Sequence, residues 1–333
     1  MRSCSLFVSA LFLGASLFTF VFGAPVSPIN SPVLVQLVPQ TISLENLALR
    51  RNGDILTTST ASSSLFLVSL NSNWTYPIVV HDFPTINILL GIAELDEDVF
   101  YVTGAVSASS PNPLNEIWEV DMRPLRISAN GTILQPAAVT LVSSDTSGGL
   151  YNGMTRLATN DTSNILLADT FLGTVTRVNV ATGESAVVIQ DPLLTVQNET
   201  NLAIAVNGIH TRYNKLYFTN LNQGVFGSVP ISLTTGEQTG TAEIIASGLF
   251  VVDDFVLKTD GTKAWVAMNG PYDLVEVDIT TKTSRVAVNS SLLGAESAVA
   301  FGRTCRDSNY LYITTSQPAG NSTIGSIVKV ALA

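Results

Sequence analysis

The chain has little cysteine, little charge and little histidine. Of its 333 residues only two are cysteines, and Cys4 lies in an apolar N-terminal leader. Cys305 is therefore expected to have no disulfide partner, and the protein must be held together by its own hydrophobic core. Because a lone cysteine is more often a small buried apolar residue than a nucleophile, we expect Cys305 to be structural.

Charged residues make up 13% of the chain, and the formal net charge is −10. The sequence contains no basic stripe, which argues against a nucleic-acid-binding surface. The same scarcity leaves few fixed charges with which to hold a strongly anionic ligand. We therefore expect a small molecule as the partner, and we expect the chain to be a monomer or a weak homodimer.

Long apolar runs are confined to the N-terminus. A single arginine precedes an apolar stretch from Leu6 to Phe22, and small residues follow it. This pattern predicts a signal peptide over residues 1–23, followed by one domain over residues 24–333. The alternative is a membrane anchor, but the stretch is short for a span of ~20 residues and no basic flank follows. We expect a protein that is secreted, or held in a secretory or vacuolar lumen, and that does not bind a membrane.

Six Asn-x-Ser/Thr sequons agree with passage through the secretory pathway. An occupied sequon has to lie on an exposed loop, because the glycan is large and hydrophilic. We expect glycosylation at Asn73, Asn130, Asn160, Asn198, Asn289 and Asn321.

Long helical periodicity is absent, and short runs rich in Val, Leu, Ile, Thr and Tyr alternate with Gly, Asn, Asp and Ser. A loose repeat contains strands such as "EIWEVDM" and "TVTRVNV", each preceded by another strand and an inner strand. The inner strands begin near residues 45, 91, 152, 207, 253 and 297. Repeats of about 40–60 residues with three or four strands each predict an all-β fold, a six-bladed β-propeller.

The last repeat is one strand short, while "PVLVQLV" at residues 32–38 is left over at the front. We predict that this N-terminal strand pairs into the last blade and closes the ring, because closure removes the exposed edges of an open array. A pair of β-sandwiches is the alternative, but it does not explain a sixfold repeat.

Polar residues stand at the head of most inner strands. Because the innermost strands of a propeller start at one mouth of the channel, these side chains should converge although they are far apart in sequence. The six head residues are Glu45, Gly91, Asn152, Asn207, Asp253 and Ser297. Carboxylate and amide oxygens without Cys or His suit a hard cation such as Ca²⁺ or Mg²⁺. The plain alternative is a polar channel that only satisfies backbone groups, with Asn-Gly acting as turn chemistry.

The Glu, Asn-Gly, Asn-Gly and Asp at successive heads resemble the regucalcin/gluconolactonase group of six-bladed propellers. The resemblance implies that Glu45, Asn152, Asn207 and Asp253 hold one divalent ion beside the substrate. The sequence departs from the family pattern at two places. Asn46 and Leu47 stand where the family has Gly-Pro, and Asp254 stands where the family has the Gly of Asp-Gly.

The chain is also similar to a secreted fungal branch of that superfamily. The likeness rests on the segments "ENLALR", "NGMTRL", "ILLADTFLGTVTRVNVATGE", "VDDFVL" and "SAVAFGRT". Characterised members of this branch resemble hetero-Diels–Alderases, which join a tropolone-derived quinone methide to a humulene-type terpene. The resemblance implies an enzyme of terpenoid secondary metabolism, although the branch has mixed activities.

Three classes of function follow. A cyclase needs two apolar partners held together and hydrogen-bond donors, for which we predict His210, Arg156 or Arg212, and it requires no cofactor. A lactonase would use Ca²⁺ or Mg²⁺ and a general base, Asp253 or Glu45. A secreted binding protein needs neither. A Ser-His-Asp hydrolase is disfavoured because Gly-x-Ser-x-Gly is absent.

Our preferred prediction is the cyclase, with the lactonase and the binding protein as alternatives. We predict Asp253, His210 and Arg156 as catalytic residues. The predicted substrate-binding residues are Glu45, Asn152, Asn207, Asp254 and Ser297.

Overall fold

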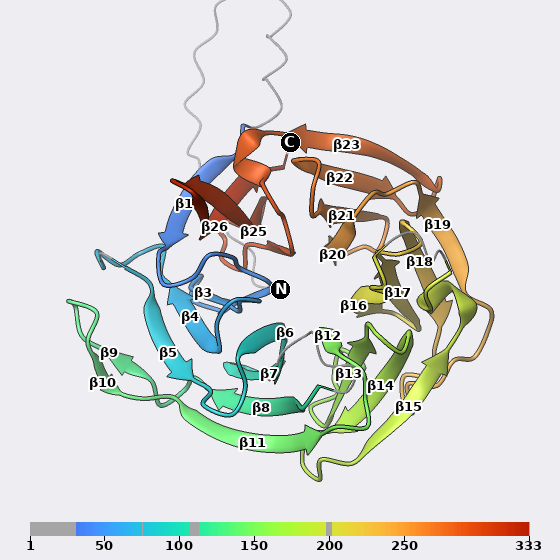
Figure 1. Cartoon of the computed structure of the whole chain (residues 1–333), viewed down its shortest axis with the longest axis horizontal. Coiled ribbons are helices and arrows are strands. Elements are labelled where there is room, and N and C mark those ends of the chain that lie inside the picture. Colours follow the sequence, from blue (N-terminus) through green and yellow to red (C-terminus); the bar gives the residue numbers. More distant parts are fainter. Residues whose placement is uncertain (1–30, 75, 107–112, 198–201, 333) are drawn as a thin grey trace, which may run out of the picture.

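The computed structural model describes residues 31–74, 76–106, 113–197 and 202–332 (Figure 1). Six four-stranded antiparallel sheets stand as blades around a central channel, which confirms the predicted six-bladed propeller and excludes the sandwich pair. In the part of the chain that is described, no helix is long and apolar enough to cross a membrane. The predicted signal peptide, residues 1–23, lies outside the described residues.

The blades follow one another in chain order, and each has one strand at the channel and three more strands outward from it. Blade 1 contains β2 (Leu47–Leu49), β3 (Ile55–Thr57), β4 (Ser64–Val68) and β5 (Ile78–Asp82). Blade 2 contains β6 (Ile88–Asp96), β7 (Val99–Ala105), β8 (Asn115–Asp121) and β11 (Ala138–Asp145). A two-stranded sheet of β9 (Arg126–Ile127) and β10 (Ile133–Gln135) is inserted in blade 2, which explains its greater length. Blade 3 contains β12 (Tyr151–Arg156), β13 (Asn164–Asp169), β14 (Thr174–Asn179) and β15 (Ser185–Gln190).

The second half of the ring repeats this arrangement. Blade 4 contains β16 (Val206–Arg212), β17 (Lys215–Asn220), β18 (Val225–Pro230) and β19 (Glu243–Ser247). Blade 5 contains β20 (Val252–Leu257), β21 (Lys263–Met268), β22 (Asp273–Asp278) and β23 (Thr283–Asn289). Blade 6 contains β24 (Val299–Phe301), β25 (Tyr310–Ala319), β26 (Ser322–Ala331) and β1 (Val33–Val38). Two short 3₁₀ helices, Pro192–Leu194 and Ser291–Leu293, precede blades 4 and 6.

The outer strand of blade 6 comes from the other end of the chain. Strand β1 pairs antiparallel with β26, and Val38 lies opposite Gly325. Val38 is fully buried and packs in one apolar cluster with Phe66 of blade 1 and Ile327 of blade 6. The first and last blades are therefore joined both by backbone pairing and by side-chain packing.

Each junction between neighbouring blades is filled by its own apolar cluster. The two faces of a blade are both buried, because each blade stands between two others. This explains why strands such as β13 consist of nearly continuous apolar residues and not of alternating ones. Burying large side chains such as Phe100, Phe218 and Phe255 stabilises the ring by about 1.5–3 kcal/mol each.

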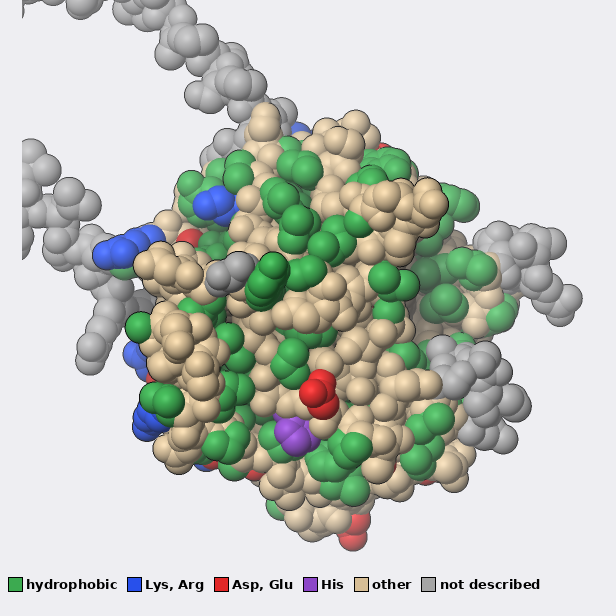
Figure 2. Space-filling model, turned by 60° about the vertical axis from the view of Figure 1, so that its left-hand side comes forward, with side chains coloured by type: hydrophobic (Ala, Val, Ile, Leu, Met, Phe, Trp, Pro, Cys, Tyr) green, Lys and Arg blue, Asp and Glu red, His purple; other side chains and the backbone are tan. Residues whose placement is uncertain are grey.

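The surface agrees with the low charge of the sequence. Figure 2 shows a face on which hydrophobic and uncharged side chains greatly outnumber charged ones. Five predicted glycosylation sites are exposed, namely Asn73, Asn130, Asn160, Asn289 and Asn321, while Asn198 lies outside the described residues. Cys305 is a free, exposed thiol in the loop before β25, so the expectation of a buried cysteine is wrong.

Candidate functional site

The backbone pairing register identifies equivalent positions in the inner strands. In β6, β12, β16 and β20 the register with the next strand shifts, which leaves two residues out of step near the start of each strand. Such a shift is a β-bulge, which bends the strand and re-aims its side chains. The corresponding residues of blades 1 and 6 lie just before β2 and β24. The first residues of these pairs form what we call the head ring: Glu45, Leu90, Asn152, Asn207, Asp253 and Ser297.

In blade 2 the ring residue differs from the one predicted from the sequence. The polar heads were aligned correctly in five blades, but in blade 2 the register shift lies between Leu89 and Ile92. Leu90 is therefore the ring residue, and Gly91 is the second residue of the bulge.

The glycine of each Asn-Gly pair is needed for close approach and not for a turn. A Cβ atom at Gly153 would lie 2.2 Å from the backbone oxygen of Asn207 in the next blade. A Cβ atom at Gly91 would lie 2.2 Å from the backbone oxygen of Asn152. In blades 2, 3 and 4 the inner strand thus approaches the next one so closely that a side chain is excluded from the second position.

Asn46, Asp254 and Ala298 carry side chains at this second position, and the first two contact each other. Asn46 Nδ2 donates to Asp254 Oδ2 at 2.7 Å. The other oxygen of Asp254, Oδ1, accepts from the Phe255 N–H at 2.7 Å and lies 3.0 Å from His210 Nε2. We name Asn46, Asp254 and His210 the channel bridge, since they connect blades 1, 5 and 4. The two departures from the regucalcin-like pattern are therefore partners.

The carboxylate of Asp253 is held by amides on both sides. Asn207 Nδ2 donates to Oδ1 and Asn269 Nδ2 donates to Oδ2, both at 2.8 Å. Asn269 also lies 3.3 Å from Ser297 Oγ. The structure thus brings together three predicted site residues. Asn269 was missed, because it follows the second strand of blade 5 and belongs to no repeated motif.

Glu45 and Asp253 are buried acids, each only 5% exposed. Burial raises the pKa of Glu45 well above its usual range, and the charges of Asp253 and Asp254 raise it further. Burial also raises the pKa of Asp253 to about 7, helped by Asp254 and opposed by the hydrogen bonds from Asn269 and Asn207. Glu45 Oε2 has no hydrogen-bond partner among the described residues. At or below neutral pH this region therefore holds protonated carboxyl groups.

His210 differs from its neighbours in exposure. Its side chain is 33% exposed, whereas that of Asp254 is only 7% exposed. The edge of its ring packs against Phe255, with the ring centroids 4.8 Å apart. When Nε2–H donates to Asp254, Nδ1 is left as an acceptor, which is the arrangement of a general base oriented by a carboxylate.

Asn152 is half-buried and makes no side-chain hydrogen bond with any residue that the structure describes. It is therefore free to contact a ligand.

The prediction that Arg156 stands beside the ring is wrong. Arg156 ends β12, whereas Asn152 lies near its start. Its guanidinium donates to the backbone oxygens of Thr159, Glu94 and Leu95. Arg212 likewise ends β16, and its guanidinium lies 5.2 Å from the centre of the Tyr213 ring. Neither arginine serves as a donor at the head ring.

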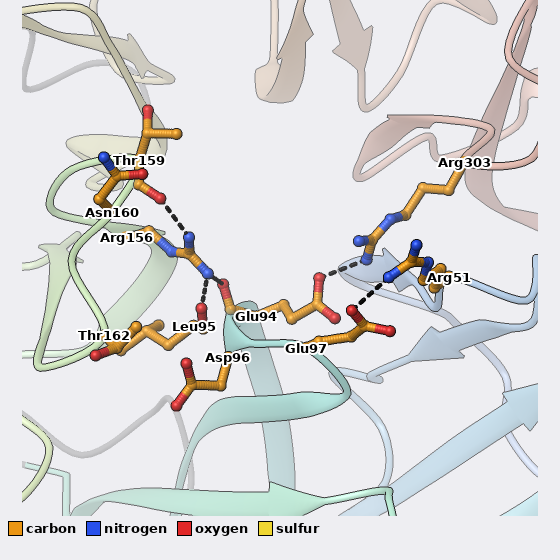
Figure 3. A pocket seen from close by; sticks show the side chains of 10 residues that line it. All are labelled: Arg51, Glu94, Leu95, Asp96, Glu97, Arg156, Thr159, Asn160, Thr162 and Arg303. Carbon is orange, nitrogen blue, oxygen red and sulfur yellow. Dashed lines mark hydrogen bonds and ion pairs between the residues drawn. The ribbon is translucent and has the colours of Figure 1, made fainter. Parts of the chain in front are cut away.

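A charged pocket of about 640 Å³ lies at the opposite mouth of the channel (Figure 3). We call it the tail pocket. Arg51 pairs with Glu97 at 2.5 Å and Arg303 pairs with Glu94, so its arginines are occupied within the pocket. Arg51 and Glu97 are both more than 60% exposed, and exposed pairs contribute little energy. The unusual chemistry lies at the head ring and the channel bridge.

The predicted metal ligands, Glu45, Asn152, Asn207 and Asp253, all belong to the head ring. Across the described ranges, no group of three or more His, Cys, Asp or Glu side chains is arranged to hold a metal ion. Both oxygens of Asp253 accept N–H groups, and Asn207 presents its N–H to Asp253. Glu45 Oε2 and the side-chain amide of Asn152 have no hydrogen-bond partner among the described residues and remain open to a ligand.

The fold is shared with solved structures. No protein-family model matches the chain, and no curated protein matches it. It is similar to regucalcin of Agrobacterium tumefaciens, described as a calcium-binding protein, with a TM-score of 0.60, 16% identity, and coverage of 91% of this chain and 96% of that one. It is also similar to a luciferin-regenerating enzyme, with a TM-score of 0.61, 12% identity, and coverage of 90% and 95%.

A third similar structure is the PQQ-bound aldose sugar dehydrogenase of Streptomyces coelicolor, with a TM-score of 0.58, 14% identity, and coverage of 90% and 98%. At such identities the likeness establishes the propeller fold. Propellers of this kind include both enzymes and binding proteins, so function has to be argued from the site.

Proposed function

We propose that this protein is an enzyme that binds small, weakly polar molecules in the channel and activates them by hydrogen bonding and proton transfer. The observation that carries the proposal is a set of buried acids without a Lys or Arg partner. Among the ion pairs of the described residues, none involves Glu45 or Asp253. A neutral carboxylic acid in such surroundings is a strong hydrogen-bond donor to a carbonyl oxygen.

The reaction class that we favour is a hetero-Diels–Alder cyclisation of terpenoid type. An electron-poor oxygen heterodiene and an alkene join through one new C–O bond and one new C–C bond. All atoms are retained, and no oxidant, leaving group or nucleophile is needed. A protonated Glu45 would polarise the heterodiene oxygen. Orientation of the two partners would supply the larger part of the rate, up to ~7–11 kcal/mol.

The residues divide into three roles. Asn207 and Asn269 hold Asp253, while burial keeps Glu45 protonated and the charges of Asp253 and Asp254 raise its pKa further. Asn46 and Asp254 orient His210, which would accept or return a proton when the heterodiene is formed. Asn152, whose amide is not engaged with other described side chains, would bind the substrate.

The first alternative is a divalent-metal-dependent lactone hydrolase. It is favoured by the free carboxylate oxygen of Glu45 and by the fold shared with a protein described as calcium-binding. The second alternative is a binding protein without catalysis. For all three we infer a secreted or lumenal, glycosylated monomer or weak homodimer, which the five exposed sequons support.

The deciding experiment is turnover with and without chelation. The purified protein is incubated with humulene and a tropolone-type quinone methide generated in situ, and separately with gluconolactone. We expect an enantiomerically enriched adduct that forms equally well after treatment with EDTA. Hydrolysis of gluconolactone that requires Ca²⁺ or Mg²⁺ would instead support the lactonase. No turnover of either substrate would overturn the enzyme proposal.

Matched variants locate the site. Glu45→Ala should slow cyclisation by about 10²-fold or more, because a hydrogen-bond donor is lost, while Glu45→Gln keeps an N–H donor and should lose less. Asp253→Asn should weaken a cyclase but abolish a lactonase. His81→Gln is the control, since His81 lies on β5, the outer strand of blade 1. Equal rates for Glu45→Ala and His81→Gln would contradict the assignment.

A further inference from the structure

A second cavity lies beside the head ring, between blades 4 and 5. It has a volume of about 540 Å³, which is within the usual range of small-molecule sites. We call it the rim pocket. Its walls include Leu221 after β17, Leu249, Phe250 and Val251 before β20, and Leu202.

The rim pocket is connected to the head ring through two strands. Val251 stands two residues before Asp253, and Leu221 follows Asn220, which pairs with Val206 next to Asn207. Asn207 and Asp253 are themselves joined by a 2.8 Å hydrogen bond. The rim pocket therefore lies at the start of the strands that carry Asn207 and Asp253.

None of the described residues that line the rim pocket has an ionised side chain. Its polar members are the amides of Asn222 and Gln223. Asn222 Nδ2 donates to the Leu202 backbone oxygen, and Gln223 Nε2 donates to the backbone oxygens of Pro192 and Thr195. Because these amides are engaged within the protein, the cavity offers mainly apolar contact and suits an uncharged ligand.

Two features of the rim-pocket wall lower the stability of the folded protein. Phe250 is 74% exposed and Leu202 is 59% exposed, although both would gain free energy from burial. Val251 has a φ of 56°, a left-handed conformation that is strongly disfavoured for a β-branched residue. Strain of this kind persists where the surrounding structure maintains it, and it concentrates at ligand sites.

We propose that the rim pocket binds the hydrocarbon body of the substrate, an uncharged apolar small molecule, and presents its polar end to Asn207 and Asp253. This inference rests on the proposed function and names where the apolar part is held. The rim pocket and the head ring then act as the two halves of one amphipathic site.

The test uses the uncharged fluorescent probe N-phenyl-1-naphthylamine and needs no substrate. We expect the full chain to bind it at one site, with fluorescence enhancement. Phe250→Asp and Leu202→Asp should each weaken binding at least about tenfold, because they place a charge in an apolar cavity. The control is Leu172→Asp, which changes an exposed leucine (54%) in the turn between β13 and β14 of blade 3. Leu172 is not among the described residues that line the rim pocket. Unchanged melting temperatures of the variants establish that they are folded.

Absence of probe binding, or equal weakening by Leu172→Asp, would overturn the inference. Light scattering tests whether a second copy of the chain occupies the rim pocket instead. A dimer that dissociates in Phe250→Asp would show this and would also overturn the inference. The two proposals fail separately. Probe binding without turnover refutes the enzyme alone, whereas turnover with a KM unaffected by Phe250→Asp refutes the rim pocket alone.

Discussion

Asp254 occupies a position at which blades 2, 3 and 4 have glycine. A Cβ atom at Gly208 would lie 2.3 Å from Asp254 Oδ1, so the carboxylate fills the space that the glycine leaves. Asn46 supplies a partner for it from blade 1, and His210 supplies one from blade 4. Asn46 and Asp254, which both differ from the regucalcin-like pattern, thus form a polar connection between blades 1, 5 and 4.

The tautomer of His210 provides a direct measure of this connection. We expect ¹⁵N spectra to show the Nε2–H form for His210, because Asp254 accepts from Nε2. Asp254→Asn should remove this preference, and Asn46→Ala should weaken it and cost about 1–3 kcal/mol of stability. The chain has only two histidines, so His81 is an internal reference. An unchanged His210 signal in Asp254→Asn would contradict the channel bridge.

Asp253 should make stability depend on pH. Its pKa rises from about 3.8 when unfolded to about 7 when folded, so the folded state binds the extra proton between these values. The contribution of Asp253 to the free energy of unfolding is therefore complete below about pH 3.8 and is lost as the pH rises to about 7. In the wild type this loss is of the order of a few kcal/mol.

Asp253→Asn should reduce that slope but not remove it, because the buried Glu45 also has a raised pKa. Urea unfolding at pH 4, 5.5 and 7.5 would measure the difference. Asp278→Asn is the control, because its exposed carboxyl has a pKa lowered by the Thr281 N–H and should leave the slope unchanged. Identical slopes for wild type and Asp253→Asn would show that Asp253 is not a buried acid.

At the scale of the elements, the bulged inner strands decide where functional side chains lie. The bulges bring neighbouring strands into close contact at the head ring. In blades 2, 3 and 4 the second residue of the bulge is glycine, because a Cβ atom there would clash with the next blade.

Gly153→Ala and Gly208→Ala should each destabilise the protein by at least about 1–3 kcal/mol, because the added methyl meets atoms of the next blade. Thermal unfolding measures the effect. Gly270→Ala is the matched control, since its Cβ would be no closer than 3.7 Å to its nearest neighbour outside the adjoining residues. Near-equal melting temperatures for Gly153→Ala and Gly270→Ala would disprove the close approach.

Sequence reasoning located the inner strands but was less accurate within them. Polar heads such as Asn152 and Asp253 were found because they recur, whereas Leu90 was missed because it is apolar and stands beside a conspicuous glycine. Arg156 was misplaced because it shares a strand with Asn152. Four residues along a strand amount to about 13 Å, which separates the two mouths of the channel. The link from Asn46 to Asp254 joins residues far apart in the chain, and no local pattern could predict it.

At the scale of the whole molecule, β1 holds the ring closed. Deleting residues 31–38 should leave β26 with an unpaired edge and remove Val38 from the cluster between blades 6 and 1. We expect a markedly lower melting temperature and aggregation on size-exclusion chromatography. Val33→Ser, which changes a half-exposed residue of β1, should behave like the wild type. A monomeric deletion variant with an unchanged melting temperature would contradict this role.

The same closure has a consequence for biosynthesis. The ribosome makes β1 before every other strand of the propeller, but its partner β26 is the last strand to be made. At about 5–20 residues per second, β1 must wait many seconds for that partner. The ring can therefore close only after β26 has been made, and the early strands need protection from wrong partners until then.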